Sequence, residues 1–270
     1  MEHFEKALER ARGGKLVKKQ TTEPSLSAPD QSATVPPAHQ FPAPSVPDSS
    51  ALLALKFKDP VADLFRLLRT QVVKGLANRK GTMLGICSAR AGEGKTFIAA
   101  NLAASIALSQ ENTVLLLDLD LRRPGVYKHF KLEPRPGITD ILAGTAKLSD
   151  SLREVAVPGL QVLLAGAPIQ NSSEALGSSD LAKAVNELRQ ASPSRIIVCD
   201  LPPLLSSDDA LMFSSKVDAI LFVVEEGRTR PGELQRSLEL LGASNVLGTV
   251  LNKSRYNNPY PYSHYEMSTA

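Results

Sequence analysis

Short apolar runs alternate with longer stretches of helical spacing along most of this chain. Apolar runs of six or seven residues predict buried strands, and they cover 82–88, 113–118, 160–165, 195–200, 219–224 and 246–251. Helical patterns separate most of them and cover 60–78, 95–109, 138–154, 178–191, 208–215 and 231–242. This alternation predicts an α/β fold with a mostly parallel central sheet and helices on both faces.

The two ends of the chain lack this alternation. Residues 1–20 begin with apolar positions at helical spacing, which predicts a short, basic amphipathic helix. Residues 21–51 are rich in Pro, Ser and Ala and hold seven of the nineteen prolines, which is typical of a disordered linker. A folded domain is expected over 52–255, and the polar residues 256–270 predict a flexible tail.

A phosphate-binding loop follows the first predicted strand. Residues 89–96 read ARAGEGKT and lie between that strand and an Ala-rich helix, which is the context that a P-loop requires, although Ala89 replaces the usual first glycine. Small residues let main-chain N–H groups surround a polyphosphate, and the helix N-terminus adds the positive end of its dipole. Lys95 is expected to contact the β- and γ-phosphates, and the Thr96 hydroxyl to bind Mg²⁺. The expected nucleotide-binding residues of this P-loop NTPase pattern are Ala91, Gly92, Glu93, Gly94, Lys95, Thr96 and Phe97.

Carboxylates follow two further predicted strands. Asp118 and Asp120 lie two residues apart at the end of one run, so both are expected to face the phosphate region. A later run ends at Asp200. Phosphoryl transfer needs a lysine and a metal ion to neutralise charge, and a group that positions or deprotonates the acceptor. One aspartate at a strand end is usually a turn residue, but three of them beside a P-loop favour a catalytic site.

Charge and composition narrow the possible functions. The first twenty residues carry six Lys and Arg against three Glu, a net charge of +3 that equals the net charge of the whole chain. The remainder is therefore neutral overall, which argues against a nucleic-acid partner. Cys87 and Cys199 fall on predicted core strands and are expected to be buried, reduced thiols. The sequence shows no apolar run of eighteen residues and no signal-peptide pattern, so a cytoplasmic protein is expected.

Four of the five tyrosines gather in the last fifteen residues. They are Tyr256, Tyr260, Tyr262 and Tyr265, and Pro, Asn and Ser surround them. On composition alone, this pattern indicates an aromatic and flexible chain end. Beside a nucleotide site, the same tyrosines become candidate phosphate acceptors.

The motifs together resemble those of the bacterial tyrosine kinases (BY-kinases) of polysaccharide export systems, which are P-loop proteins related to partition-type ATPases. The resemblance covers about 57–255 and the tail. The loop at 89–96 is similar to the family's Walker A motif, LLLDLDLRRP at 115–124 to its Walker A′ motif, and VCDLPP at 198–203 to its Walker B motif.

This resemblance implies an ATP- and Mg²⁺-dependent protein-tyrosine autokinase. Lys95 would stabilise the phosphates, and Asp118 or Asp120 would orient or deprotonate the incoming tyrosine hydroxyl. The metal ligands would be Thr96, Asp118 and Asp200. The segment GTVLN resembles the strand whose Asn contacts adenine, which here is Asn252. The tail tyrosines would be phosphorylated in trans between subunits.

The resemblance also implies partners. Residues 63–69 (DLFRLLR) are similar to the helix through which the family's rings assemble, so Asp63, Arg66 and Arg69 would contact a neighbouring subunit, although Asp63 stands where the family usually has Glu. A separate inner-membrane polysaccharide co-polymerase would activate the kinase and hold this cytoplasmic protein at the membrane. Phosphorylation would then regulate polymerisation or export of an exopolysaccharide.

Two other functions stay open. Arg90 stands where partition-type ATPases carry a signature lysine, so one alternative is a positioning ATPase that hydrolyses ATP with water. The other is a non-catalytic scaffold, in which nucleotide closes a ring that binds the membrane co-polymerase. Of the three functions, the kinase alone needs the tail tyrosines.

Overall fold

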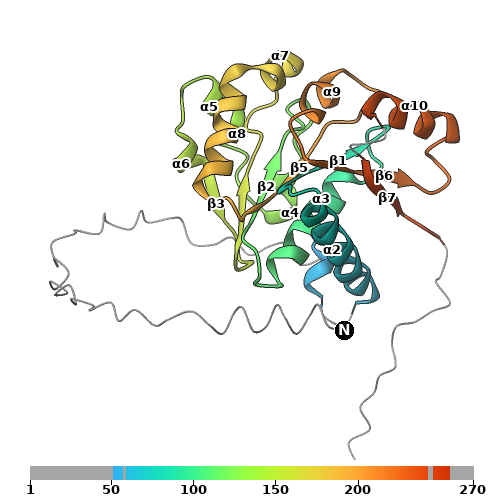
Figure 1. Cartoon of the computed structure of the whole chain (residues 1–270). Helices are drawn as coiled ribbons and strands as arrows, with labels where there is room; N and C mark the ends of the chain where they lie inside the picture. The colour runs from blue at the N-terminus through green and yellow to red at the C-terminus, as the bar shows by residue number, and fades with distance from the viewer. Residues whose placement is uncertain (1–50, 57–58, 243–245, 256–270) are drawn as a thin grey trace, which may run out of the picture. The chain divides into compact units, whose positions relative to one another are not determined.

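A seven-stranded sheet forms the centre of the computed structural model, which describes residues 51–56, 59–242 and 246–255 (Figure 1). The strands are β1 (Met83–Ser88), β2 (Val114–Asp118), β3 (Leu152–Glu154), β4 (Leu160–Leu163), β5 (Ile196–Asp200), β6 (Ala219–Glu225) and β7 (Val246–Asn252). Their order is β3-β4-β2-β5-β1-β6-β7, and every neighbouring pair is parallel except β3 with β4. The prediction of an α/β fold with a mostly parallel sheet is confirmed.

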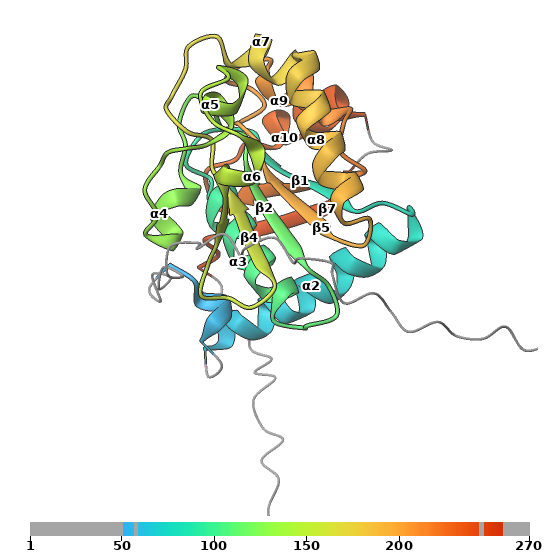
Figure 2. The same ribbon diagram turned by 90° about the vertical axis from the view of Figure 1, so that its left-hand side faces the viewer.

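Helices cover both faces of this sheet (Figure 2). They are η1 (Leu53–Leu55), α2 (Pro60–Asn78), α3 (Lys95–Ala107), α4 (Val126–Phe130), α5 (Ile138–Leu142), α6 (Leu148–Ser151), α7 (Ser172–Gly177), α8 (Ser179–Ala191), α9 (Asp209–Ser214) and α10 (Pro231–Leu241). One apolar core joins α2, α3 and α4 to strand residues such as Leu84 and Leu116. A second core joins α5, α8, α9 and α10 to the residues that alternate with these, such as Cys87 and Leu115. Because successive side chains of a strand point to opposite faces, strands buried on both faces are apolar throughout.

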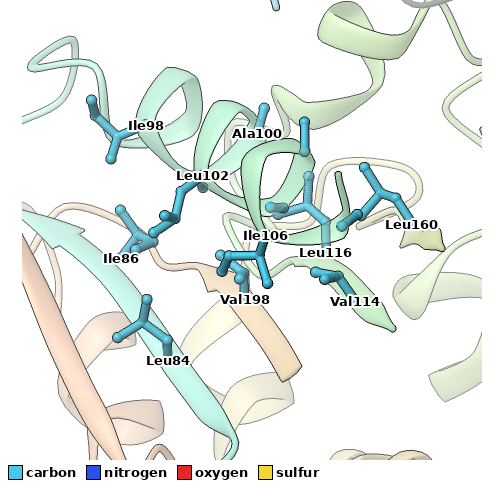
Figure 3. Close-up of a cluster of buried hydrophobic side chains, with 14 of the residues drawn as sticks. Leu84, Ile86, Ile98, Ala100, Leu102, Ile106, Val114, Leu116, Leu160 and Val198 are labelled. Carbon is cyan, nitrogen blue, oxygen red and sulfur yellow. The ribbon is translucent and has the colours of Figure 1, made fainter. Parts of the chain in front are cut away.

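Helix α3 is buried along almost its whole length, and its apolar side chains gather against the sheet (Figure 3). Leu102 and Ile106 pack in one cluster with Ile86 and Val198 of the strands beneath. The many alanines of the helix let it lie close to the strands. The polar Asn101 is also buried, and its Oδ1 accepts the N–H of Ala54 at 2.9 Å, which joins η1 to the helix. This packing fixes the N-terminus of α3 directly after the loop that leaves β1.

The predicted helix over 138–154 is wrong. That segment consists of α5, α6 and the short strand β3, which pairs antiparallel with β4. Gly144 has a φ of 70° just after α5, and this left-handed conformation ends the helix. The N–H of Ile138 donates to the carbonyl of Leu164 at 2.8 Å, so the start of α5 binds the residues that follow β4. The strand β4 ends at Leu163 rather than at the predicted residue 165.

The other predicted elements agree with the structure to within two residues at each end. The short helices η1, α4 and α7 were not predicted. Cys87 and Cys199 are fully buried free thiols, as expected. Among the described residues, no helix is both long enough and apolar enough to cross a membrane. The predicted basic helix, most of the linker and the tail lie outside the described residues.

The packing of α3 predicts a large cost for truncating one of its core side chains. The change Ile106→Ala should lower the free energy of unfolding by about 2–4 kcal/mol, because it leaves a cavity between helix and sheet. The matched change Leu240→Ala, at a side chain that is 46% exposed, should cost less than about 0.5 kcal/mol. Urea unfolding of the two variants measures both costs, and equal losses would contradict the assignment of α3 to the core.

Candidate active site

The P-loop connects β1 to α3 at the carboxyl end of the sheet. Gly92 and Gly94 have φ values of 86° and 94°, which glycine adopts without strain. Gly94 is the last residue before α3, so the N–H groups of the first helical turn follow directly on the loop. Left-handed glycines that lead into a helix N-terminus form an arrangement suited to binding an anion.

The side chain of Glu93 braces the P-loop from within the protein. It is completely buried, and its carboxylate accepts the N–H of Arg90 at 2.8 Å and the hydroxyl of Thr229. The first bond closes the loop on itself, and the second attaches the loop to the segment that follows β6. The expectation that Glu93 binds nucleotide therefore concerns its main-chain N–H, and it stays a prediction.

Lys95 lies between two carboxylates. Its Nζ is 2.7 Å from Asp120 Oδ2 and 3.6 Å from Asp200 Oδ1, and its side chain is 8% exposed. Burial alone lowers the pKa of an amine, but the charges of Asp200 and Asp120 outweigh that effect and raise the pKa of Lys95 above its ordinary value. Lys95 is therefore a fixed positive charge at the end of the P-loop.

Asp118 and Asp200 end neighbouring strands and are partners in the register of β2 and β5. Both are fully buried, and Asp118 Oδ2 accepts the N–H groups of Gly125 and Val126 at 3.1 Å each. Burial, followed by the negative charge of Asp200, raises the pKa of Asp118 to about 7. Burial also raises the pKa of Asp200. The site thus holds one carboxyl group, that of Asp118, which exchanges its proton near neutral pH.

Thr96 and Asp200 fit a magnesium site. The Thr96 hydroxyl donates to Asp200 Oδ2 at 2.6 Å, whereas the buried Asp200 Oδ1 has no hydrogen-bond partner among the described residues. Mg²⁺ usually binds one or two protein carboxylates, phosphate oxygens and several waters rather than an all-protein cage. Within the described ranges, no group of three or more His, Cys, Asp or Glu side chains forms such a cage. The donor set of Thr96, Asp200 and the adjacent Asp118 therefore suits an ion that arrives with a nucleotide.

Side chains from two distant segments contact the main chain of the P-loop. Asn252 Nδ2 donates to Glu93 O at 2.9 Å. The expected contact of Asn252 with adenine stays a prediction. Lys253 Nζ donates to Gly92 O at 2.8 Å, and Arg228 Nη2 donates to Ala91 O at 3.3 Å. Sequence reasoning missed Arg228 and Lys253, because they lie 137 and 161 residues from their partners and no local pattern marks them.

A second unpredicted cluster supports the loop after β2. Arg122 Nε donates to Ser172 Oγ at 2.6 Å and to Asp209 Oδ2 at 2.9 Å, and Ser172 Oγ also donates to Asp209 Oδ2. Burial raises the pKa of Asp209, but these hydrogen bonds outweigh burial and hold the pKa below its ordinary value. The cluster joins the residue two positions after Asp120 to the starts of α7 and α9.

The residues expected at a subunit contact lie on α2. Asp63 pairs with Arg66 one turn along the helix, and both side chains are at least one third exposed. Arg69 Nη1 instead donates to Ser105 O of α3 in the same chain, at 3.0 Å. The role of these three residues in assembly stays a prediction. The acceptor tyrosines of the tail lie beyond the described part of the chain.

Comparisons with known proteins first define the class of protein. The family model of the CobQ/CobB/MinD/ParA nucleotide-binding domain matches residues 84–268. The cell-division ATPase MinD of Pyrococcus furiosus has a similar structure, with a TM-score of 0.54 and 23% identity over 67% of this chain and 76% of MinD. That second likeness concerns the fold alone. Fold and site together define a P-loop nucleotide-binding protein.

Relatives with higher similarity narrow the class further. The putative tyrosine-protein kinase CapB of Staphylococcus aureus is 30% identical over 212 residues, which cover 78% of this chain and 92% of CapB. The kinase domain of the Escherichia coli tyrosine kinase ETK has a TM-score of 0.70 and 27% identity over 79% of this chain and 84% of that domain. The succinoglycan biosynthesis transport protein ExoP of Rhizobium meliloti (strain 1021) is 36% identical over 211 residues, which cover 76% of this chain and 26% of ExoP. This chain therefore belongs to the CobQ/CobB/MinD/ParA nucleotide-binding family and, within it, to the bacterial tyrosine kinases.

The raised pKa of Asp118 predicts how stability depends on pH. In the folded protein this carboxyl takes up its proton as the pH falls through about 7, whereas in the unfolded chain it does so near 4. The folded state thus binds more protons in this window, and the free energy of unfolding falls as the pH rises from about 4 to about 7. The variant Asp118→Asn should not show this part of the pH dependence, which is on the order of 4 kcal/mol in the free energy of unfolding across the window.

Urea unfolding in EDTA between about pH 4.5 and pH 8 measures this dependence. The variant Asp180→Asn, at a side chain that is 68% exposed, removes the same charge and should give a curve parallel to the wild type. A parallel curve for Asp118→Asn as well would show that Asp118 titrates normally.

Proposed function

We propose that this protein is an ATP- and Mg²⁺-dependent protein-tyrosine autokinase that phosphorylates its C-terminal tyrosines. The observation that supports this most is the arrangement of Asp118, Asp120 and Asp200 around Lys95 at the end of a P-loop. A tyrosine hydroxyl, with an ordinary pKa near 10, becomes a nucleophile when a carboxylate orients or deprotonates it. The relatives named as tyrosine kinases support the same assignment.

The residues of the site would divide the work as follows. The N–H groups of the P-loop bind the phosphates, and Lys95 neutralises charge on the β- and γ-phosphates. As Lys95 turns to the phosphates, Asp120 loses its partner, and its carboxylate becomes available to the tyrosine hydroxyl. Thr96, Asp118 and Asp200 would hold Mg²⁺, which would supply positive charge to offset the charge developing on the phosphoryl group. The protein's contribution is thus mainly position and electrostatics.

The proposed acceptors are Tyr256, Tyr260, Tyr262 and Tyr265 of a neighbouring subunit. Self-association through Asp63, Arg66 and Arg69 of α2 would bring one tail to the next site in a ring. A separate inner-membrane polysaccharide co-polymerase would activate the protein and hold it at the cytoplasmic side of the membrane. The similarity to ExoP, a succinoglycan biosynthesis transport protein, supports a role in regulating exopolysaccharide polymerisation or export.

A second candidate function is that of a positioning ATPase, which the fold shared with MinD supports. In that case water would be the acceptor, and Arg90 would take the place of a signature lysine. In the structure Arg90 forms an ion pair with Glu233 of α10. A nucleotide-gated scaffold without catalysis is the third candidate.

The kinase proposal predicts self-phosphorylation that depends on both Lys95 and the tail. Purified protein incubated with ATP and Mg²⁺, with the activator's cytoplasmic segment once it is identified, should gain phosphate on tyrosines of residues 256–265. The variant Lys95→Met should lose at least about 100-fold in rate, because it removes charge stabilisation from the transferring group. The matched variant Lys128→Met, at an exposed lysine of α4, should keep the wild-type rate. Intact mass and peptide mapping give the readout.

A chain that ends after Arg255 separates the three candidates. A kinase loses self-phosphorylation on this truncation, whereas an ATPase keeps a Lys95-dependent turnover. A scaffold shows neither activity and keeps nucleotide-dependent assembly. ATP consumption without phosphotyrosine in the full chain would contradict the kinase and favour the ATPase.

A further inference from the structure

Three successive carbonyl groups of the P-loop each accept a hydrogen bond from a side chain outside the loop. Arg228 binds Ala91 O, Lys253 binds Gly92 O, and Asn252 binds Glu93 O. Arg228 follows β6, Asn252 ends β7, and Lys253 is the next residue. These contacts therefore come from the ends of two neighbouring strands at one edge of the sheet (Figure 1). We call these three residues, together with Glu225, the outer brace.

The outer brace fixes the direction of the N–H groups on the other side of the same peptides. A trans peptide is planar, and its C=O and N–H point in opposite directions. Among the described residues, the peptide between Arg135 and Pro136 is the one cis bond, so all three loop peptides are trans. Holding the carbonyls of Ala91, Gly92 and Glu93 therefore turns the N–H groups of residues 92, 93 and 94 away from the brace. Those N–H groups are the donors that a P-loop offers to phosphate.

Glu225 positions the two cations of the outer brace. Its Oε2 lies 3.2 Å from Arg228 Nη1 and 3.1 Å from Lys253 Nζ, and its side chain is 13% exposed. Burial raises the pKa of Glu225, but the hydrogen bond and charge of Lys253 and the charge of Arg228 outweigh it, so the carboxylate is ionised. One acid thus holds both cations over the loop.

The glycines of the loop leave the space that the outer brace occupies. A Cβ on Gly94 would lie 2.1 Å from Asn252 Nδ2, and a Cβ on Gly92 would lie 3.1 Å from Arg228 Nη1. The absence of side chains at these two positions therefore serves close approach of the brace as well as the left-handed backbone.

We propose that Glu225, Arg228, Asn252 and Lys253 are positioning residues that preorganise the P-loop N–H groups for the diphosphate part of the nucleotide. The proposal rests on nucleotide binding at the P-loop, as the proposed function does. Donors that are already held in the binding direction need no reorganisation when the phosphates arrive, which strengthens binding. Loss of the brace should therefore weaken ADP more than AMP, because ADP places one more phosphate in the loop.

The proposal and a simple charge effect predict opposite signs for one substitution. Removing a negative charge near a phosphate site strengthens phosphate binding if charge alone matters. In the variant Glu225→Gln, however, both cations lose the group that positions them, so the brace loosens and binding weakens. Glu226→Gln removes the same charge from the next residue, whose carboxylate accepts the N–H of Arg255 at 2.6 Å rather than binding the brace.

Calorimetric titration of the full chain with ADP and with AMP, in the presence of Mg²⁺, tests the proposal. We expect Glu225→Gln to weaken ADP binding about tenfold, with a smaller effect on AMP, and Glu226→Gln to leave it unchanged or slightly tighter. Lys253→Met should weaken ADP binding similarly, and Lys253→Arg should restore most of it. Tighter ADP binding by Glu225→Gln, or equal effects of Glu225→Gln and Glu226→Gln, would overturn the proposal.

A second measurement, made without nucleotide, tests the brace independently of nucleotide binding and of kinase activity. Hydrogen–deuterium exchange of a peptide that contains residues 89–96 should be faster in Glu225→Gln than in Glu226→Gln, while exchange in β2 stays unchanged. Equal exchange in the two variants would contradict the brace even if affinities differ. The wild type could bind ADP in a way that requires Lys95 while Glu225→Gln and Glu226→Gln show equal ADP affinity and equal exchange. In that case this inference fails and the proposed function stands. A wild type that binds no nucleotide contradicts both.

Discussion

One buried lysine among three carboxylates is the constraint on which the site depends. The parallel order of β2, β5 and β1 brings Asp118, Asp200 and the P-loop to the same end of the sheet, and Asp120 follows two residues after β2. Lys95 balances part of that negative charge, and burial, together with the charge that stays unbalanced, raises the pKa values of Asp118 and Asp200. A magnesium ion and a polyphosphate would complete the charge balance, so the electrostatics of the site suit the binding of both together.

Local signals explain how much of the molecule the sequence predicts. The whole P-loop motif lies within eight consecutive residues, and the aspartates stand at the ends of apolar runs. The residues that carry the chemistry can therefore be recognised together with the elements that position them. The strands beneath helix α3 are buried on both faces of the sheet, and helix α3 is buried along almost its whole length. Such elements require nearly continuous apolar runs, which the sequence shows directly. The assignment to the bacterial tyrosine kinases rested on the same motifs, and the comparisons confirm it.

Contacts between distant segments explain what the sequence does not predict. The apolar spacing over 138–154 resembles a helix, but Gly144 and the bonds from α5 to the residues after β4 divide the segment. The contacts of Arg228 and Lys253 with the P-loop, and the pair of Arg122 with Asp209, join residues 87 to 161 positions apart. No window of sequence therefore contains both partners. The role of the Glu93 side chain was likewise not predictable from the motif, because its carboxylate accepts a hydrogen bond from a residue between β6 and α10.

The most direct test of the charge balance is the number of protons released when ADP and Mg²⁺ bind. Calorimetry near pH 7 in buffers of different ionisation enthalpy gives this number. Because a carboxyl group must be ionised to hold Mg²⁺, the account predicts that the wild type releases more protons than Asp118→Asn, in which that group cannot titrate. Equal proton release from the two proteins would show that the buried carboxylates are already ionised, and it would contradict the central role of the carboxylates around Lys95.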